Sequence, residues 1–341
     1  MKFKVRLFVI LSLFVALTTA FLLKGFQLSS TISFSYVKIG IDTSHMPNHI
    51  TFDDFINNYT SAGNDVFELD NLNNIDQLNA LLIPGSRTSY TDEELNAIAQ
   101  WFHQGHKLLF ITADSDYSGI FQSDASLNPL LRFLNSSLRF DSGAVADAIH
   151  NDGMSYRVIA TQPGNGTIGS QVNIGITQIL LHGPTTVFGV IDGQAVDLRN
   201  TTIPNVEILF SYSNDSQILD QDVSEVDSDF YFYHTEKQGD YPAVVAEKMN
   251  NSYLLLAGEC LFTDYKYMFG TTGEHGTPID NHYFTIRLLN YFYELYWKSE
   301  ITTKLTTTTT NTSTVRFDLI SPFVFLAFGV LALVAKRKMK N

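Results

Sequence analysis

Side chains that can take part in chemistry follow the ends of several apolar segments of this sequence. Asp42 and His45 follow the first segment, Asp114 and Ser115 follow KLLFIT, and Glu259 follows LLLAG. Carboxylates, hydroxyls and an imidazole are groups that recognise hydroxyl-rich or anionic ligands. We therefore name seven candidate ligand-binding residues: His45, Ser86, Arg87, Asp114, Ser115, Glu259 and Asp280.

Nucleophilic catalysis would need a hydroxyl or thiol activated by an adjacent base. Neither Ser86 nor Ser115 lies in a Gly-x-Ser-x-Gly motif, so each is more simply interpreted as a turn hydroxyl. Cys260 is the single cysteine, which excludes a disulfide framework and a cysteine-based zinc site. A free cysteine is usually buried and inert. We therefore predict no catalytic residue.

Histidines offer two arrangements for a metal ion. His103 and His106 are three positions apart, but Gly105 ends the expected helix between them, which favours a solvated helix terminus. The other arrangement consists of His45, Glu259, Asp280 and His282. It would bind a divalent ion or a sugar if the loop after the first strand and the loop after 252–260 lie at the same end of the sheet. The competing interpretation is that Asp280 caps a helix and His45 hydrogen-bonds a loop. We predict no metal and no cofactor.

Apolar segments and helix signals alternate through the first half of the chain. Residues 91–105 are the clearest helix, because Thr91 and Glu94 form a capping box and Gly105 ends it. Alternating strands and helices at short spacing predict an α/β fold with a doubly wound, mostly parallel sheet, whose ligands bind at the carboxyl ends of the strands. The expected strands are 32–42, 65–70, 79–85 and 107–114, and the other expected helices are 51–63, with a Thr cap, and 128–138.

The middle of the chain, about 140–235, changes to short segments rich in β-branched residues, which predict a β-rich insertion lying near or over the site. Two further strands, 241–249 and 252–260, are joined by an Asn-Asn turn. Residues 282–299 form a final helix, with Asp280 or Asn281 as its cap. The α/β domain therefore extends over 32–299.

Both ends of the chain carry membrane signals. Residues 1–28 predict a secretory signal segment, either cleaved or kept as an anchor. Residues 301–318 are a Thr-rich stalk, 319–335 an apolar transmembrane helix, and 336–341 a basic tail. The basic tail predicts a single-pass protein of the cell membrane with its tail in the cytoplasm and its body outside. The alternative is a sorting signal that is cut and replaced by another anchor.

The charge and the glycosylation motifs agree with an exposed body. The formal net charge is −13, which argues against a nucleic-acid partner, because such a partner needs a basic surface. Seven Asn-x-Ser/Thr sequons are candidate glycosylation sites. They begin at Asn58, Asn135, Asn165, Asn200, Asn214, Asn250 and Asn311.

Three segments in this order resemble the class I glutamine-amidotransferase-like superfamily of flavodoxin-like fold. They are the first strand with DTSH, the segment LLIPGSRTSYTDEELNAIAQWFHQGHKLLFITAD, and YLLLAGECLFTD followed by Asp280-Asn281. The sequence is most similar to the non-catalytic branch, with gliding-motility and ABC-transporter-associated membrane proteins and the intraflagellar-transport domain. Gly258-Glu259-Cys260 departs from the Gly-Asp-Ser-like turn of that branch.

The resemblance implies a function without catalysis. A working amidotransferase has a cysteine after the strand that here ends in Ala113-Asp114-Ser115, and this chain has none there. We expect an extracytoplasmic binding module for a glycan, a peptide or a partner subunit, accessory to an ABC-type transport system. The chain has no P-loop of its own. The alternatives are a hydrolase or metal-dependent enzyme that uses the His/carboxylate cluster, and a purely structural surface-layer protein.

Overall fold

The computed structural model describes residues 37–297, except for 47–49, 116–122, 221–231 and 234–237. The expected signal segment, stalk, apolar helix and basic tail lie outside these residues. Within the described part of the chain, no helix combines the length and the apolar character that crossing a bilayer requires.

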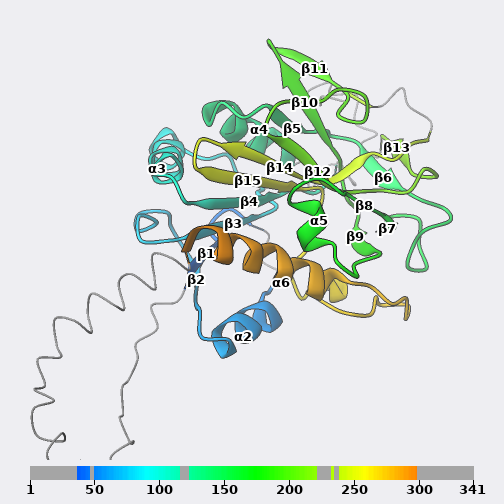
Figure 1. The fold of residues 1–341 in the computed structure, drawn as a ribbon, viewed down its shortest axis with the longest axis horizontal. Helices are drawn as coiled ribbons and strands as arrows, with labels where there is room; N and C mark the ends of the chain where they lie inside the picture. Colours follow the sequence, from blue (N-terminus) through cyan, green and yellow to red (C-terminus); the bar gives the residue numbers. More distant parts are fainter. Residues whose placement is uncertain (1–36, 47–49, 116–122, 221–231, 234–237, 298–341) are drawn as a thin grey trace, which may run out of the picture. The chain divides into compact units, whose positions relative to one another are not determined.

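The centre of the fold is one eight-stranded sheet with the order β2-β1-β3-β4-β15-β14-β12-β8 (Figure 1). The first five strands in this order are parallel to one another, and each of the last three is antiparallel to the strand before it. The expected α/β fold with a mostly parallel sheet is confirmed. In that order the strands are β2 (Asp65–Leu69), β1 (Lys38–Asp42), β3 (Ala80–Pro84), β4 (Leu108–Thr112), β15 (Ser252–Ala257), β14 (Pro242–Met249), β12 (Val206–Ser211) and β8 (Gln162–Pro163).

Helices cover both faces of this sheet because successive strand residues point to opposite sides. Leu82 and Phe110 belong to the apolar core under α2 (Asp53–Ser61) and α6 (Asn281–Phe292). Leu81 and Leu109, one position away, belong to the core under α3 (Asp92–His103) and α4 (Ser123–Phe133). Figure 1 shows α6 below β4 and β15 with α2 beneath it, and α4 on the opposite side of these strands.

The N-terminal caps expected for α3 and α2 can be compared with the structure. The capping box of α3 is confirmed, since the Thr91 hydroxyl accepts from the Glu94 N–H and the Glu94 carboxylate accepts from the Thr91 N–H. The expected Thr cap of α2 is wrong: Phe52 is the N-cap residue and no side chain caps there. Instead the distant Asp264 carboxylate accepts from the Asp54 N–H at 3.2 Å. A cap supplied from 210 residues away cannot be inferred from local sequence.

Two other helices begin or end differently from expectation. α4 begins at Ser123 rather than 128, so Asn128 lies inside it and its amide bonds both backbone groups of Phe140. α6 is followed by a short π-helical segment, Tyr293–Trp297, whose Trp297 indole donates to the His106 carbonyl. The last helix thereby closes against the loop before β4.

The β-rich middle of the chain is confirmed and contributes to the central sheet. Its strands β12 and β8 extend that sheet beyond β14, and the others form small sheets beside it. These are β5 (Leu138–Phe140) with β10 (Val187–Ile191) and β11 (Gln194–Val196), β6 (Ala144–Ala146) with β13 (Gln217–Leu219), and β7 (Arg157–Ala160) with β9 (Ile179–His182); a short helix, α5 (Gly169–Val172), lies between β8 and β9.

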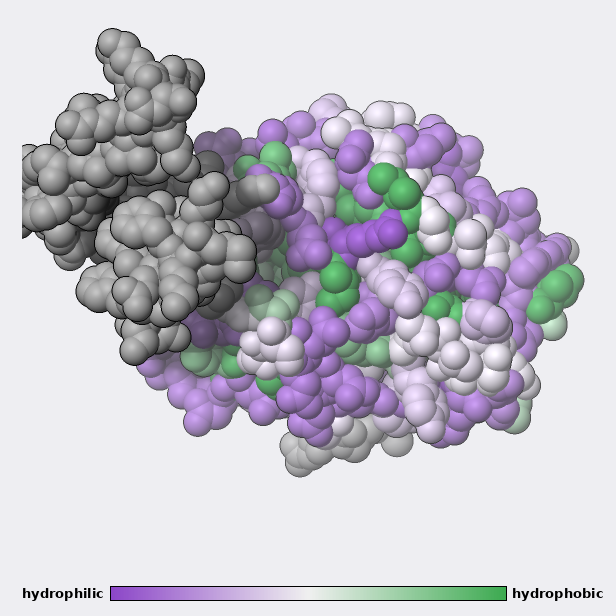
Figure 2. All heavy atoms as spheres, turned by 60° about the horizontal axis from the view of Figure 1, so that its bottom comes forward, coloured by the Kyte–Doolittle hydropathy of each residue, from purple (hydrophilic) through white to green (hydrophobic). Residues whose placement is uncertain are grey.

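The side of the molecule that carries α2 and α6 is brought forward in Figure 2. Its described surface is mostly polar, and its apolar residues occur in small separate groups. Such a distribution is ordinary for a water-exposed domain.

Candidate functional site

The parallel strands end at one edge of the sheet, which we call the carboxyl edge. Pro84 of β3 and Ala257 of β15 are both in register with Thr112 of β4. The Arg87 N–H donates to the His45 carbonyl at 2.9 Å, which joins the loops after β3 and β1. The strand order reverses between β1 and β3, the position where doubly wound sheets form ligand crevices. The structure thus brings the loops after β1, β3, β4 and β15 together.

A closed hydrogen-bonded network lies where β1 ends. The Asp42 carboxylate accepts from the Ser44 hydroxyl at 2.5 Å and from the Tyr90 hydroxyl at 3.0 Å. His45 Nδ1 lies 2.9 Å from Asp42 Oδ2, and its Nε2 lies 3.5 Å from Glu94 Oε2. The Tyr90 ring stacks on the imidazole at a centroid distance of 4.1 Å. Both imidazole nitrogens of His45 therefore already face carboxylates.

Ser44, His45 and Asp42 are the residue types of a hydrolase triad, but their geometry differs from one. In a triad, the serine contacts one imidazole nitrogen and the aspartate contacts the other. Here the Ser44 hydroxyl lies 2.9 Å from Nδ1, the same nitrogen that faces Asp42. The Ser44 hydroxyl also donates to Asp42 itself. This arrangement positions a loop and does not deprotonate a serine.

The two neighbouring carboxylates shift the pKa of His45. Burial lowers the pKa of His45, but the hydrogen bond and negative charge of Asp42, together with Glu94, outweigh burial and raise this pKa above its usual value. Glu94 has two roles, because the oxygen that faces His45 also accepts from the Thr91 N–H of the capping box. The capping box that the sequence predicts therefore also holds the imidazole.

Ser86 and Arg87 both follow β3, but Ser86 is buried and Arg87 is exposed. The Ser86 side chain is buried, and its hydroxyl donates to the Thr88 carbonyl at 2.8 Å within the turn. The Ser86 carbonyl accepts from the Ser126 hydroxyl of α4. Arg87 is exposed at the same edge. Ser86 is therefore occupied in holding the turn.

Asp114, Ser115 and Glu259 form a second group where β4 and β15 end. The Ser115 N–H donates to Asp114 Oδ1 at 2.9 Å and to the Gly183 carbonyl at 3.3 Å. The Ser115 side chain is fully buried, and its hydroxyl has no hydrogen-bond partner among the described residues. Buried polar atoms are nearly always hydrogen-bonded, so the unpaired Ser115 hydroxyl is an exception that calls for an explanation.

Burial and the neighbouring Asp114 carboxylate both act on the pKa of Glu259. Burial raises the pKa of Glu259 well above its usual range, and the negative charge of Asp114 raises it further. The shift is in the direction of the neutral carboxyl, which can donate as well as accept a hydrogen bond, and Glu259 Oε1 already accepts from the Cys260 N–H at 2.8 Å. Cys260 beside it is 2 % exposed, and burial raises the pKa of its thiol, so the expectation of a buried free cysteine is confirmed.

Aromatic side chains from the insertion and from the loop after β15 adjoin the second group. His182, next to Gly183, contacts the rings of Tyr156 and Tyr265 edge-on, each at a centroid distance of 5.3 Å. Burial, with the positive charge of Arg157, lowers the pKa of His182 to about 4, so its imidazole is neutral at physiological pH. Tyr265 interacts electrostatically with both Glu259 and Asp114. The site thus combines two carboxyl groups, a hydroxyl and half-buried rings.

A buried ion pair fixes the loop that carries Tyr265. Arg157 on β7 is 1 % exposed, donates to Asp152 at 2.7 Å and contacts Glu274 at 2.9 Å. Lys266 and Tyr267 in this loop have φ values of +51° and +63°, a left-handed backbone that costs energy for residues other than glycine. Such strain persists only where surrounding contacts enforce it, and it concentrates at functional sites.

Two sequence-predicted residues lie apart from this second group. Asp280 is the N-cap residue of α6, as expected, but its side chain makes no capping hydrogen bond. The Asp280 carboxylate instead accepts from the Thr177 N–H at 2.8 Å and from the Thr177 hydroxyl, so it joins α6 to the insertion. His282 lines an open groove of about 560 Å³ beside α2. Among the described residues, no group of three His, Cys, Asp or Glu side chains is placed to hold a metal ion.

Sequence reasoning missed Tyr90, Tyr156, His182 and Tyr265. Tyr90 immediately precedes a capping box, and this nearness to a helix start was the one available signal. The other three lie in the insertion or in the loop after β15, and only their packing brings them to the carboxyl edge. Six predicted sequon asparagines are exposed on the described surface: Asn58, Asn135, Asn165, Asn200, Asn214 and Asn250. Asn311 lies outside the described residues.

The fold defines an α/β class that is shared with a known domain. The N-terminal domain of IFT52 (mmIFT52) matches with a TM-score of 0.52 at 9% sequence identity, over 74% of this chain and 96% of that domain. At this identity the likeness shows the fold alone. No protein-family model matches the chain, and no curated protein matches it.

Two more distant structures also match. A GMP-synthase-type protein from Thermoplasma acidophilum gives a TM-score of 0.38 at 7% identity, over 78% of this chain and 98% of that one. An exo-β-1,4-mannosidase from an Opitutaceae bacterium gives 0.35 at 9% identity, over 67% of this chain and 32% of that one. Scores this low carry no argument about function.

Proposed function

We propose that this protein is a membrane-anchored, extracytoplasmic binding module without catalytic activity, and that its ligand is a glycan. The ligand site is the second group at the carboxyl edge, formed by Asp114, Ser115 and Glu259 with the rings of His182 and Tyr265. The observation that carries this proposal is the buried Ser115 hydroxyl, which has no partner among the described residues.

A neutral, hydroxyl-rich ligand fits this group better than a charged one. The raised pKa of Glu259 favours a neutral carboxyl beside Asp114, and such a pair can both donate to and accept from sugar hydroxyls. The nearby cations Arg157 and Lys266 are already paired with Asp152 and Glu274. Half-buried tyrosine and neutral histidine rings supply the apolar faces against which sugar rings pack.

Glycan binding is tested with the full chain in mild detergent on an array of neutral and acidic glycans. Ser115→Ala should weaken binding about fivefold, because one hydrogen bond contributes about 1 kcal/mol. Ser86→Ala is the matched control, since the Ser86 hydroxyl is occupied by the Thr88 carbonyl. Equal effects of the two substitutions, or retention of peptides but of no glycan, would contradict the proposal.

The membrane topology rests on the apolar residues 319–335 and the basic tail 336–341. Protease added to intact cells should remove the body and leave a small C-terminal fragment. A body that is cut only after lysis would reverse the orientation. An accessory role beside an ABC-type transporter rests on the sequence resemblance alone, and mild-detergent co-purification of permease or ATPase subunits tests it.

The alternative function is a hydrolase. It is favoured by the presence of Ser44, His45 and Asp42 side by side, but both partners face the same imidazole nitrogen. A hydrolase would lose turnover of ester and glycoside substrates on Ser44→Ala. Turnover that is abolished by this substitution, with the fold intact, would replace the binding proposal.

A further inference from the structure

The open groove of about 560 Å³ beside α2 lies against one face of that helix. Asp54, Asn57, Asn58 and Ser61 line it, and all four are exposed. Their spacing of three and four positions places them on the same side of α2. The volume falls within the range of about 300–1,000 Å³ that is usual for ligand pockets. This side of the groove offers an occupant a carboxylate, two amides and a hydroxyl.

Aromatic rings line the other side of the same groove. Tyr283 on α6 is 52% exposed and lines it together with His282 and Phe269. The His282 imidazole lies against the rings of Phe269 and Tyr283, at centroid distances of 4.8 and 5.5 Å. Burial lowers the pKa of His282, so its imidazole is neutral at physiological pH. An exposed ring beside amides and hydroxyls offers both the apolar face and the hydrogen bonds that a sugar requires.

One residue of this groove, Asn58, also begins a sequon, Asn58-Tyr59-Thr60. The middle residue of the sequon fixes its place against α6, because Tyr59 is buried and its hydroxyl donates to the Ile286 carbonyl at 3.5 Å. A sugar attached to Asn58 would therefore start inside the groove. A tethered group acts at an effective concentration in the millimolar range, so even a weak contact with the rings would be populated.

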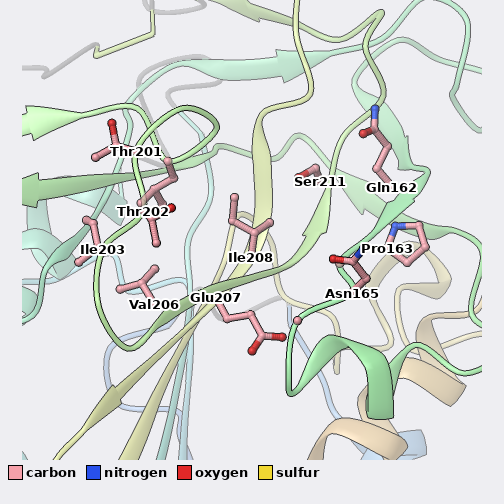
Figure 3. Close-up of a pocket in the computed structure, with 13 residues that line it drawn as sticks. Gln162, Pro163, Asn165, Thr201, Thr202, Ile203, Val206, Glu207, Ile208 and Ser211 are labelled. Atoms are coloured by element: carbon pink, nitrogen blue, oxygen red, sulfur yellow. The ribbon is translucent and has the colours of Figure 1, made fainter.

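A different groove supplies the comparison for this site. It has a volume of about 390 Å³, lies along β12, and is lined by Asn165, which is exposed and also begins a sequon (Figure 3). None of the described residues that line this second groove is aromatic. A sugar on Asn165 would therefore find polar and aliphatic neighbours but no ring. Asn165 is thus the matched control for Asn58.

We propose that Asn58 carries an N-linked glycan whose first sugar packs against Tyr283 in this groove and joins α2 to α6. The donor is a lipid-phosphate- or lipid-pyrophosphate-linked oligosaccharide. The side-chain amide nitrogen attacks the anomeric carbon, the carbon–oxygen bond to phosphate breaks, a carbon–nitrogen bond forms, and the amide loses one proton as the lipid phosphate leaves. In the folded helix the Thr60 hydroxyl donates to the Ile56 carbonyl at 2.7 Å, so the transfer precedes the folding of α2. This proposal rests on the extracytoplasmic location proposed above and is independent of the ligand at the carboxyl edge.

The test uses the full chain in mild detergent, purified from membranes of a host that performs N-glycosylation. Peptide mass spectrometry should find a glycan at Asn58. Asn58→Gln should lower the midpoint of thermal unfolding by about 2–4 °C, because it removes one ring contact together with the sugar. Asn165→Gln, which removes a sequon from the groove without a ring, should leave the midpoint unchanged.

Substitutions of the ring separate a sugar contact from other effects of the glycan. Tyr283→Ala should lower the unfolding midpoint of the glycosylated protein by a similar amount. The same substitution combined with Asn58→Gln should add little, because the contact is already lost. Tyr283→Phe retains the ring and should behave as the unchanged protein. Equal losses from Tyr283→Ala with and without the sequon would overturn the proposed contact.

The outcomes also separate this proposal from the topology and from the carboxyl-edge site. Glycans on other sequons with Asn58 bare would overturn it while the body is still outside the cell. A body that protease cannot reach on intact cells would overturn the topology and this proposal together. The effect of Ser115→Ala on the glycan array reports on the carboxyl edge alone, so that site stands or falls separately.

Discussion

The Tyr90 hydroxyl donates to Asp42 Oδ2 at 3.0 Å, and both side chains are buried. This bond joins the end of β1 to the residue that precedes the α3 capping box, 48 positions later. The same Asp42 oxygen faces His45, and the Tyr90 ring stacks on that imidazole. The turn at the β1/β3 switch point is thus fixed by contacts within the protein.

Tyr90→Phe should destabilise the protein by about 1.5–3 kcal/mol, because it removes a buried hydrogen bond to a charged group. Tyr267→Phe removes a hydroxyl from a side chain that is 61% exposed and serves as the control, with no measurable change expected. Urea unfolding followed by circular dichroism measures both. An equally stable Tyr90→Phe variant would show that the bond is formed only weakly in solution.

The stability of the protein should fall as the pH rises above about 6.5, the usual pKa of histidine. Asp42 and Glu94 raise the pKa of His45 against the opposing effect of burial. The proton on His45 therefore contributes stability that is complete below about pH 6.5 and is lost as the pH rises through the folded-state pKa. His45→Gln should remove this part of the pH dependence, whereas His103→Gln, at an exposed position on α3, should retain it. Identical pH profiles of the two variants would contradict the assignment.

Arg157→Met should cost about 3–5 kcal/mol, because it leaves the fully buried Asp152 without its cation. The loop with Tyr265 should loosen as well, since Arg157 also contacts Glu274. Hydrogen exchange of residues 264–278 measures the second effect. Arg87→Met, at an exposed position, should be much milder. A comparable loss in both variants would mean that the buried pair contributes little.

Cys260 should resist thiol reagents in the native protein and react once the protein unfolds. The side chain is 2 % exposed and burial raises its thiol pKa, so little thiolate is present. Cys260→Ala should leave glycan binding unchanged and cost about 1–2 kcal/mol. Rapid labelling of the native protein, or loss of binding by a folded Cys260→Ala variant, would favour the enzyme alternative over the binding module.

The sequence by itself determined the elements whose signals are local. The α3 capping box, the β3 and β4 core strands and the Asn-Asn turn at Asn250 depend on residues a few positions apart, and the structure has all of them. Parallel strands at short spacing also place their carboxyl ends at one edge. The convergence of the loops with His45, Ser86 and Glu259 followed from that rule alone.

Tertiary structure alone decided which of the convergent side chains are already held by contacts within the protein. His45 is enclosed by Asp42, Tyr90 and Glu94, and Asp280 is held by Thr177, whereas the Ser115 hydroxyl has no partner among the described residues. The cap of α2 comes from Asp264, and the ring contact beside the second group joins His182 of the insertion to Tyr265 of the loop after β15. Each of these contacts joins residues far apart in the chain, and its existence depends on how the insertion packs against the sheet. Periodicity and spacing report only on neighbours along the chain, so they could indicate the edge where a site forms but not the side chains that form it.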